Sequence, residues 1–218
     1  MTKELDKALE VKVALLQEQL AAIARDYAPA AFANSLGAED MVLTDMIARG
    51  GAEIGIFSLD TGRLPAETYE LMQEVKRRYR LPIQGYFPDH KAVETYVAEH
   101  GPNAFYESVE LRKRCCHIRK VEPLKRALQG KKAWITGLRR EQSATRVDLP
   151  LVEWDEPNRM HKFNPLRDWT TNDVWAYIRH FDVPYNKLHD KFYPSIGCAP
   201  CTRAIAVGED LRAGRWWW

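Results

Sequence analysis

The sequence predicts an α/β protein with a doubly wound, mainly parallel sheet in a single domain, residues 1–218. Short apolar segments alternate with helical segments over most of the chain, as is typical of parallel sheets covered by helices. Polar turns with one glycine each follow the first two strand segments, where such sheets bind ligands. No repeat, linker or low-complexity tract divides the chain.

The individual elements follow from apolar spacing. Residues 1–27 hold an amphipathic N-terminal helix, because apolar side chains recur there at steps of three and four. The rest of the domain spans residues 28–218. Strands are expected at residues 30–34, 53–59, 83–87 and 133–137, with a short hairpin from 149–154 and 161–163. Helices are expected at residues 41–48, 65–80 and 91–100, through Cys115 and Cys116 to Leu128, at 174–181, and from about Cys198 onward.

Composition excludes several classes of protein. The chain has 218 residues, is 45% hydrophobic and carries a formal charge of only +2, so a general polyanion binder is disfavoured. It has no apolar run of membrane-spanning length, and its N-terminus lacks the apolar core of a signal peptide. We therefore expect a soluble, cytoplasmic protein without nucleic-acid or membrane partners, whose thiols stay reduced.

The four cysteines form two tight pairs, Cys115-Cys116 and Cys198-Ala199-Pro200-Cys201. The adjacent pair cannot easily close on itself, since its Cα atoms lie about 3.8 Å apart and disulfides prefer roughly 4.4–6.8 Å. The second pair has a spacing at which both thiolates reach one metal centre. The economical interpretation is one site built by two distant segments.

Four interpretations of these sulfurs compete. Inert buried thiols would not explain the pairing. A redox dithiol at Cys198 and Cys201 would leave the first pair without a role. A structural zinc site usually takes ligand pairs two to four residues apart, from which Cys115-Cys116 departs. A four-thiolate iron–sulfur cluster is the best single answer, although spacing alone places it only slightly ahead of zinc.

Two further patterns concern anions. The turn Ser35–Asp40 begins a helix, so its backbone N–H groups suit a phosphate or sulfate; an ordinary turn capped by Ser35 or Asp40 is the alternative. Basic residues gather around both cysteine pairs and after the fourth strand, where they would offset an anionic cluster or grip an anion. The six histidines show no metal-like spacing, and packing is the simpler role for each.

Five motifs in order resemble the assimilatory adenylylsulfate (APS) and phosphoadenylylsulfate (PAPS) reductases. They are Ser35-Leu36-Gly37-Ala38-Glu39-Asp40, Leu59-Asp60-Thr61-Gly62-Arg63, Lys113-Arg114-Cys115-Cys116 with Arg119-Lys120, Thr136-Gly137-Leu138-Arg139-Arg140-Glu141-Gln142-Ser143, and Gly197-Cys198-Ala199-Pro200-Cys201-Thr202-Arg203. The two cysteine pairs are similar to those of the iron–sulfur branch, which reduces APS.

This resemblance implies a fold of the adenine nucleotide alpha-hydrolase type with a modified pyrophosphatase loop. It also implies a role for each matching residue. The Ser35–Asp40 loop, including Gly37, would hold the phosphosulfate, Leu59 and Thr61 would meet adenine and ribose, and Arg146, Arg212 and Arg215 would be counter-charges. Cys115, Cys116, Cys198 and Cys201 would ligate a 4Fe-4S cluster, with Lys120 between cluster and substrate.

The chemistry implied by the resemblance is nucleophilic. A cysteine thiolate on a C-terminal tail attacks the sulfate sulfur of APS, AMP leaves, and thioredoxin reduces the S-sulfocysteine to release sulfite, as part of sulfate assimilation and cysteine biosynthesis. In the family that cysteine lies beyond the arginine and tryptophan run, and this chain stops at Trp218. We expect these 218 residues to bind APS without turning it over.

Three alternatives remain open at this stage. The chain would be a PAPS-using reductase if it carried a cationic partner for a 3'-phosphate. It would be an ATP-dependent ligase or sulfurtransferase of the same fold if its loop cradled pyrophosphate, but Ser35–Asp40 lacks the second glycine and final serine of such loops. A zinc-stapled binding module is disfavoured by the balanced charge. The oligomeric state is not determined, and a homo-oligomer is among the options.

Overall fold

The computed structural model describes residues 6–142 and 148–218. Its helices are α1 (Lys7–Asp26), α2 (Ala38–Gly50), α3 (Ala66–Tyr79), α4 (His90–His100), α5 (Val109–Cys116), α6 (Glu122–Leu128) and α7 (Thr171–His180). Its strands are β1 (Ala30–Ala33), β2 (Ile54–Leu59), β3 (Ile83–Tyr86), β4 (Ala133–Ile135), β5 (Val152–Asp155) and β6 (Met160–Phe163). Short 3₁₀ turns lie at Ala104–Tyr106, Arg140–Gln142, Lys187–Lys191 and Ala199–Cys201.

The strands form one sheet in the order β3-β2-β1-β4-β6-β5. All neighbouring pairs are parallel except β5 and β6, which form the expected hairpin. The reversal of strand order at β1 is the topological switch point of a doubly wound sheet. The α/β fold class predicted from the sequence is therefore confirmed.

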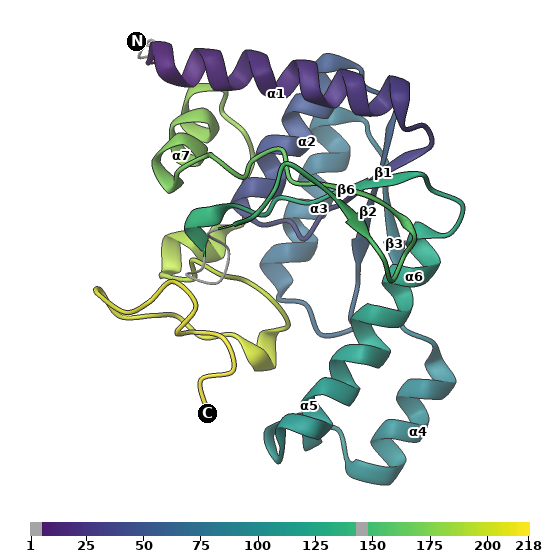
Figure 1. Cartoon of the computed structure of the whole chain (residues 1–218). Helices are drawn as coiled ribbons and strands as arrows, with labels where there is room; N and C mark the ends of the chain where they lie inside the picture. The colour runs from purple at the N-terminus through teal and green to yellow at the C-terminus, as the bar shows by residue number, and fades with distance from the viewer. Residues whose placement is uncertain (1–5, 143–147) are drawn as a thin grey trace.

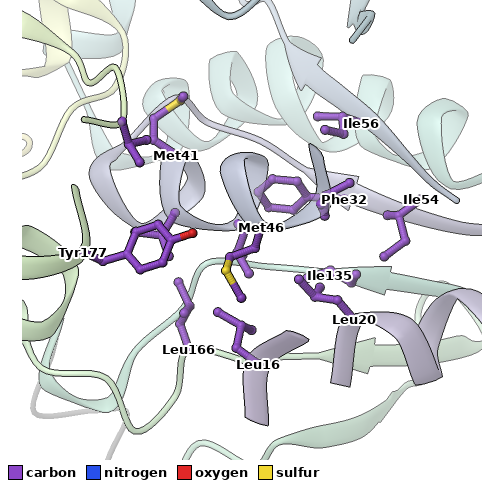
Figure 2. Packing of buried hydrophobic residues seen from close by; sticks show 14 of the residues in the cluster. Leu16, Leu20, Phe32, Met41, Met46, Ile54, Ile56, Ile135, Leu166 and Tyr177 are labelled. Atoms are coloured by element: carbon purple, nitrogen blue, oxygen red, sulfur yellow. The ribbon is translucent and has the colours of Figure 1, made fainter. Parts of the chain in front are cut away.

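Helices cover both faces of this sheet (Figure 1). Side chains of β1 alternate between two apolar clusters, because successive residues of a strand point to opposite faces: Phe32 joins the cluster with α1, α2, α3 and α7, and Ala31 joins the one with α6. Figure 2 shows the larger cluster, in which Leu16 and Leu20 of α1 pack near Met46 and Ile135. This cluster holds the sheet rigidly beneath the site.

Two helix starts test the local predictions. Helix α7 begins at Thr171, earlier than expected, and has a full capping box, with Thr170 and Asp173 each accepting from the other's backbone N–H. Helix α2 also begins earlier than expected, at Ala38, with Gly37 at its N-cap position. The first turn of α2 therefore lies inside the polar motif.

The first cysteine pair lies on a composite helix. Helix α5 ends at Cys116, residues His117–Val121 form a π-helical turn, and α6 continues to Leu128. One helical segment through Leu128 was expected, but the π turn was not. Such turns are rare and occur frequently at functional sites.

The helix expected from Cys198 onward is wrong. Ala199–Cys201 make a single 3₁₀ turn, after which Thr202 is extended and bridges to Arg215. The backbone N–H of Arg203 donates to Gly214 at 2.9 Å, and a Cβ on Gly214 would lie 2.3 Å from the Arg203 carbonyl oxygen. The chain thus folds back on itself through a close approach that only glycine permits.

No helix among residues 6–142 and 148–218 combines the length and the apolar character needed to cross a bilayer. Helices α4 and α5 lie away from the sheet, and the C-terminal segment lies beyond the sheet on that side (Figure 1).

Candidate functional site

Three neighbouring cavities lie where the parallel strands end. We name them the polar cavity, of about 400 Å³, the narrow cavity, of about 180 Å³, and the cysteine cavity. Arg215 lines all three, Ser35 lines the first two, and Lys120 and Cys198 line the last two. The three cavities therefore form one continuous site.

The turn after β1 forms one wall of the polar cavity. Ser35 donates from both its backbone N–H and its hydroxyl to Asp40 Oδ2, each at 2.6 Å, and Leu36 has a left-handed φ of 62°. The first N–H groups of α2 have no partner within the helix and face an anion favourably. The turn is thus shaped by its own polar side chains and presents a helix N-terminus.

Asp40 is a buried acid in this wall. Burial raises the pKa of Asp40 to about 7, against the hydrogen bonds from Ser35 that lower it. Gly137, after β4, must be glycine, because a Cβ there would lie 2.0 Å from Asp40 Oδ1. The segments after β1 and β4 therefore meet at this carboxyl group.

Arg139 holds the same wall in place through ion pairs. Its guanidinium is 3% exposed and pairs with Glu39 at 2.8 Å and with Glu141 at 2.9 Å. Its Nη1 also donates to the Trp169 carbonyl oxygen at 3.2 Å. Because two carboxylates already neutralise it, Arg139 fixes the position of Glu39 and α2.

The turn after β2 joins the narrow cavity to the cysteine cavity. Leu59 and Thr61 line the narrow cavity, and the Thr61 hydroxyl lies 3.2 Å from Cys198 Sγ. Arg119, on the π turn, donates to the Thr61 carbonyl oxygen at 2.6 Å. Thr61 thus contacts both segments that carry cysteines.

All four cysteines line the cysteine cavity. Burial raises the pKa of the Cys115 thiol. Burial and the neighbouring Cys198, Cys116 and Cys115 raise the pKa of the Cys201 thiol to about 11, while Lys120 opposes the shift. The two pairs, far apart in sequence, are therefore electrostatic neighbours.

Cations surround these sulfurs. The cavity is also lined by Arg63, Arg112, Arg119, Lys120 and Arg215. The backbone N–H of Ala199 donates to the Arg63 carbonyl oxygen at 2.8 Å, which fastens the second cysteine pair to the turn after β2. Arg119 and Arg63 oppose the rise in the pKa of Cys115, and Lys120 opposes the rise in the pKa of Cys201.

The donor set of this cavity is purely sulfur. Soft thiolates select zinc, copper(I) or iron–sulfur centres. Within residues 6–142 and 148–218, no three His, Cys, Asp or Glu side chains are arranged to hold a single metal ion. All four sulfurs line this one cavity.

Arg215 is the link among the cavities. Burial lowers the pKa of Arg215, and Arg212 adds to this effect, while Cys198, Cys201 and Cys116 oppose it. Its Nε is buried without a hydrogen-bond partner in the described part of the chain. A Cβ on Gly197 would lie 2.2 Å from its Nη2, so a larger residue there would displace this guanidinium.

The sequence matches the family described as the phosphoadenosine phosphosulfate reductase domain over residues 29–204. The chain belongs to this family. Among its members, a protein of Burkholderia cepacia is 60% identical over 210 residues, which cover 96% of this chain and 84% of that protein. One of Allochromatium vinosum is 57% identical over 210 residues, covering 96% and 82%. Both are named adenosine 5'-phosphosulfate reductase.

Solved structures place the fold of this family member. The phosphate complex of the PAPS reductase of Candida auris aligns with a TM-score of 0.75 at 27% identity, over 93% of this chain and all of that one. The FMN adenylyltransferase of Candida glabrata with ATP aligns with a TM-score of 0.61 at 15% identity, over 91% and 65%, which speaks for the fold alone. These neighbours agree with the expected adenine nucleotide alpha-hydrolase-like fold.

The structure brings most of the predicted site residues of this family member together. Ser35, Gly37, Arg212 and Arg215 line the polar cavity; Ser35, Leu59, Thr61, Lys120 and Arg215 line the narrow cavity; Cys115, Cys116, Cys198, Cys201, Lys120 and Arg215 line the cysteine cavity. Arg146 lies outside the described residues.

Other lining residues of the polar cavity include Arg139, Lys162 and His189. Sequence reasoning placed Arg139 among the basic residues that follow the fourth strand and could grip an anion, but it gave Arg139 no separate role. It missed Lys162 and His189 as site residues, since they come from the hairpin strand β6 and from the 3₁₀ turn Lys187–Lys191.

Proposed function

We propose that this chain is the substrate-binding and cluster-binding part of an adenylyl sulfate (APS) reductase, which converts APS to sulfite and AMP. The observation that supports it best is Arg215, a partly buried cation that lines the polar cavity, the narrow cavity and the cysteine cavity. The names of the relatives agree with this activity. It would serve sulfate assimilation and cysteine biosynthesis in the cytoplasm.

The substrate would occupy the two larger cavities. Adenine and ribose fit the narrow cavity against Leu59 and Thr61. The phosphosulfate then reaches the polar cavity, where Ser35, Gly37 and the N-terminus of α2 face Arg212 and Arg215. Guanidinium groups bind phosphate and sulfate oxygens by paired hydrogen bonds. Arg146 remains a further proposed counter-charge.

The cysteine cavity would hold a 4Fe-4S cluster through Cys115, Cys116, Cys198 and Cys201. Zinc would need all four sulfurs within about 2.3 Å of one ion, whereas a four-iron cluster accepts four thiolates spread around a larger group. When bound, the cluster supplies a fixed charge and a structural clamp. Lys120, which lines both this cavity and the narrow cavity, would link that charge to the substrate.

The reaction would begin with a thiolate outside the four cavity cysteines. The thiolate attacks the sulfate sulfur, a sulfur–sulfur bond forms, and the bond from that sulfur to the bridging oxygen breaks. AMP leaves with the electron pair, and Arg212 and Arg215 stabilise the charge on its phosphate. A thioredoxin dithiol then supplies two electrons, becomes a disulfide, and releases sulfite and the free cysteine thiol.

All four cysteines of the 218 residues line one cavity, so this proposal assigns the attacking thiolate to none of them. These residues by themselves should therefore bind APS without forming AMP. PAPS would need a cationic partner for its 3'-phosphate near the ribose. Among the described residues that line the narrow cavity, the lysine and arginine residues are Lys120 and Arg215, and both already have roles beside the phosphosulfate or the cluster. APS is therefore the preferred substrate.

Equilibrium dialysis tests this proposal with the 218-residue chain and APS, PAPS or ATP. We expect APS to bind at least about tenfold more tightly than PAPS, and ATP to release no pyrophosphate. Arg215→Gln should weaken APS binding by about ten- to a hundredfold, since charge-assisted hydrogen bonds are lost. The exposed Arg25→Gln is the matched control. Tighter binding of PAPS, or equal binding by Arg215→Gln, would contradict the assignment.

A further inference from the structure

His189 is a polar-cavity residue with an unsatisfied nitrogen. It lies on the 3₁₀ turn Lys187–Lys191 and lines the polar cavity. Its ring packs edge-to-face on Trp175 with centroids 5.3 Å apart. Nε2 is buried and has no hydrogen-bond partner among the described residues. Buried polar atoms without a partner are uncommon and call for a ligand, a water or a functional explanation.

The hydrogen bonding of Nδ1, the other ring nitrogen of His189, decides whether Nε2 carries a proton in the neutral ring. A hydrogen bond with the backbone of Tyr193 favours the protonated ring. Since Nε2 has no partner, this bond must involve Nδ1. The Tyr193 N–H already donates to Leu188, so this interaction is with the Tyr193 carbonyl oxygen and favours a proton on Nδ1. In the neutral ring Nε2 then carries only a lone pair.

We propose that His189 is a substrate-binding residue whose Nε2 takes up a proton and donates a hydrogen bond to an anionic oxygen of the bound phosphosulfate. This inference rests on the proposed function, because it needs an adenylyl sulfate in the polar cavity. A bare lone pair would repel an anion, whereas a protonated Nε2 adds a charge-assisted donor opposite the Ser35 turn.

The charges around His189 allow this proton uptake. Burial lowers the pKa of His189 below its usual value, while Glu39 and Asp190 oppose the shift. The ring is therefore mostly neutral at pH 7 in the free protein. His189 lines the polar cavity and a second, neighbouring cavity. The acidic and basic residues that line one or both of them are Glu39 and Asp40 from α2, Arg139 after β4, Lys162 from β6, and Glu209, Arg212 and Arg215 from the C-terminal segment.

An arriving phosphosulfate adds negative charge beside this ring, so the ring binds a proton more tightly in the complex than in the free protein. Affinity for APS should therefore fall as pH rises, by up to about tenfold per unit, between the two ring pKa values. The phosphosulfate itself stays ionised over this range.

Calorimetry in buffers of different ionisation enthalpy measures the protons taken up when APS binds the 218-residue chain. Asp40 lies in the same cavity and has a pKa of about 7, so the measurement is made in an Asp40→Asn background. Adding His189→Gln should remove up to about one proton of uptake. It should weaken APS binding by about ten- to a hundredfold at pH 6 and little at pH 8. Adenosine binding should not change, and the exposed His90→Gln is the matched control.

Nitrogen-15 NMR of histidine-labelled Asp40→Asn chain provides a readout that needs no change at His189. Addition of APS should move the Nε2 resonance of His189 to that of a protonated ring. Unchanged proton uptake and pH dependence in His189→Gln, or a ring that stays neutral, would overturn the inference while APS binding itself continues. A chain that binds no APS at any pH would instead overturn the proposed function, and this inference with it.

Discussion

The sheet core and the cysteine cavity are held together by different forces. The core joins α1, α2, α3 and α7 to the sheet through a continuous cluster of buried apolar side chains (Figure 2). Helix α5 and the π turn, which carry the first cysteine pair and its cations, have no fully buried residue. Hydrophobic burial stabilises the first region, and specific polar contacts assemble the second.

The contacts around the cysteine cavity are mainly cationic and aromatic. The Arg112 guanidinium lies over the Trp216 ring at 5.1 Å, and the Arg63 guanidinium lies over Phe105 at 5.0 Å. The Tyr106 hydroxyl donates to the Pro200 carbonyl oxygen at 2.7 Å. These contacts bring the two cysteine segments together without forming an apolar core. Stability of the fold and assembly of the cysteine cavity therefore depend largely on separate residues.

The largest expected effect is on the core side of this comparison. Phe32→Ala should reduce the free energy of unfolding by about 3–5 kcal/mol, since the Phe32 ring is fully buried and its removal leaves a cavity. Chemical denaturation measures this loss. Val11→Ala, at a side chain that is 60% exposed, is the control and should cost less than about 0.5 kcal/mol. Equal losses in the two variants would show that the core contributes no more than the surface.

A smaller effect on the free energy of unfolding, which depends on pH, is expected from Asp40 in the wall of the polar cavity. The pKa of Asp40 is raised to about 7 by burial, from about 3.9 in an unfolded chain. The folded state therefore holds this proton more tightly. Its contribution to stability is present below pH 4 and is lost as pH rises to 7, by at most about 1.4 kcal/mol per unit.

Asp40→Asn should flatten the decline in the free energy of unfolding between pH 4 and pH 7. Chemical denaturation at a series of pH values between 4 and 8 measures this decline. Glu94→Gln, at an exposed position of α4, is the matched control. A decline of the same steepness in Asp40→Asn would mean that other groups cause it.

The sheet core was easier to predict from the sequence than the segments around the cysteine cavity. Strands such as Ala30–Ala33 and the capping box at Thr170 are encoded by neighbouring residues, so local pattern was sufficient. The fold-back of Arg203 onto Gly214 depends on backbone contacts between residues eleven positions apart, so a helix was wrongly expected from Cys198. The π turn at His117–Val121 has no local signature that sequence reasoning used.

The site was predictable where a motif follows a strand. Ser35 and Thr61 lie directly after β1 and β2, and parallel strands bring their carboxyl ends to one edge. The resemblance identified Arg215 only as a counter-charge. No sequence pattern indicated that Arg215 lines all three cavities and so joins them. His189 looked like a packing histidine, because its unpaired Nε2 becomes visible only in three dimensions.

Metal analysis of anaerobically purified protein, beside the Cys201→Ser variant, tests most directly whether the two sulfur pairs share one iron-bearing centre. The proposal predicts brown protein with about four irons and four sulfides per chain, and loss of both in Cys201→Ser while far-UV circular dichroism still shows a folded sheet core. Colourless protein loaded with zinc, or an iron content that Cys201→Ser leaves unchanged, would contradict it.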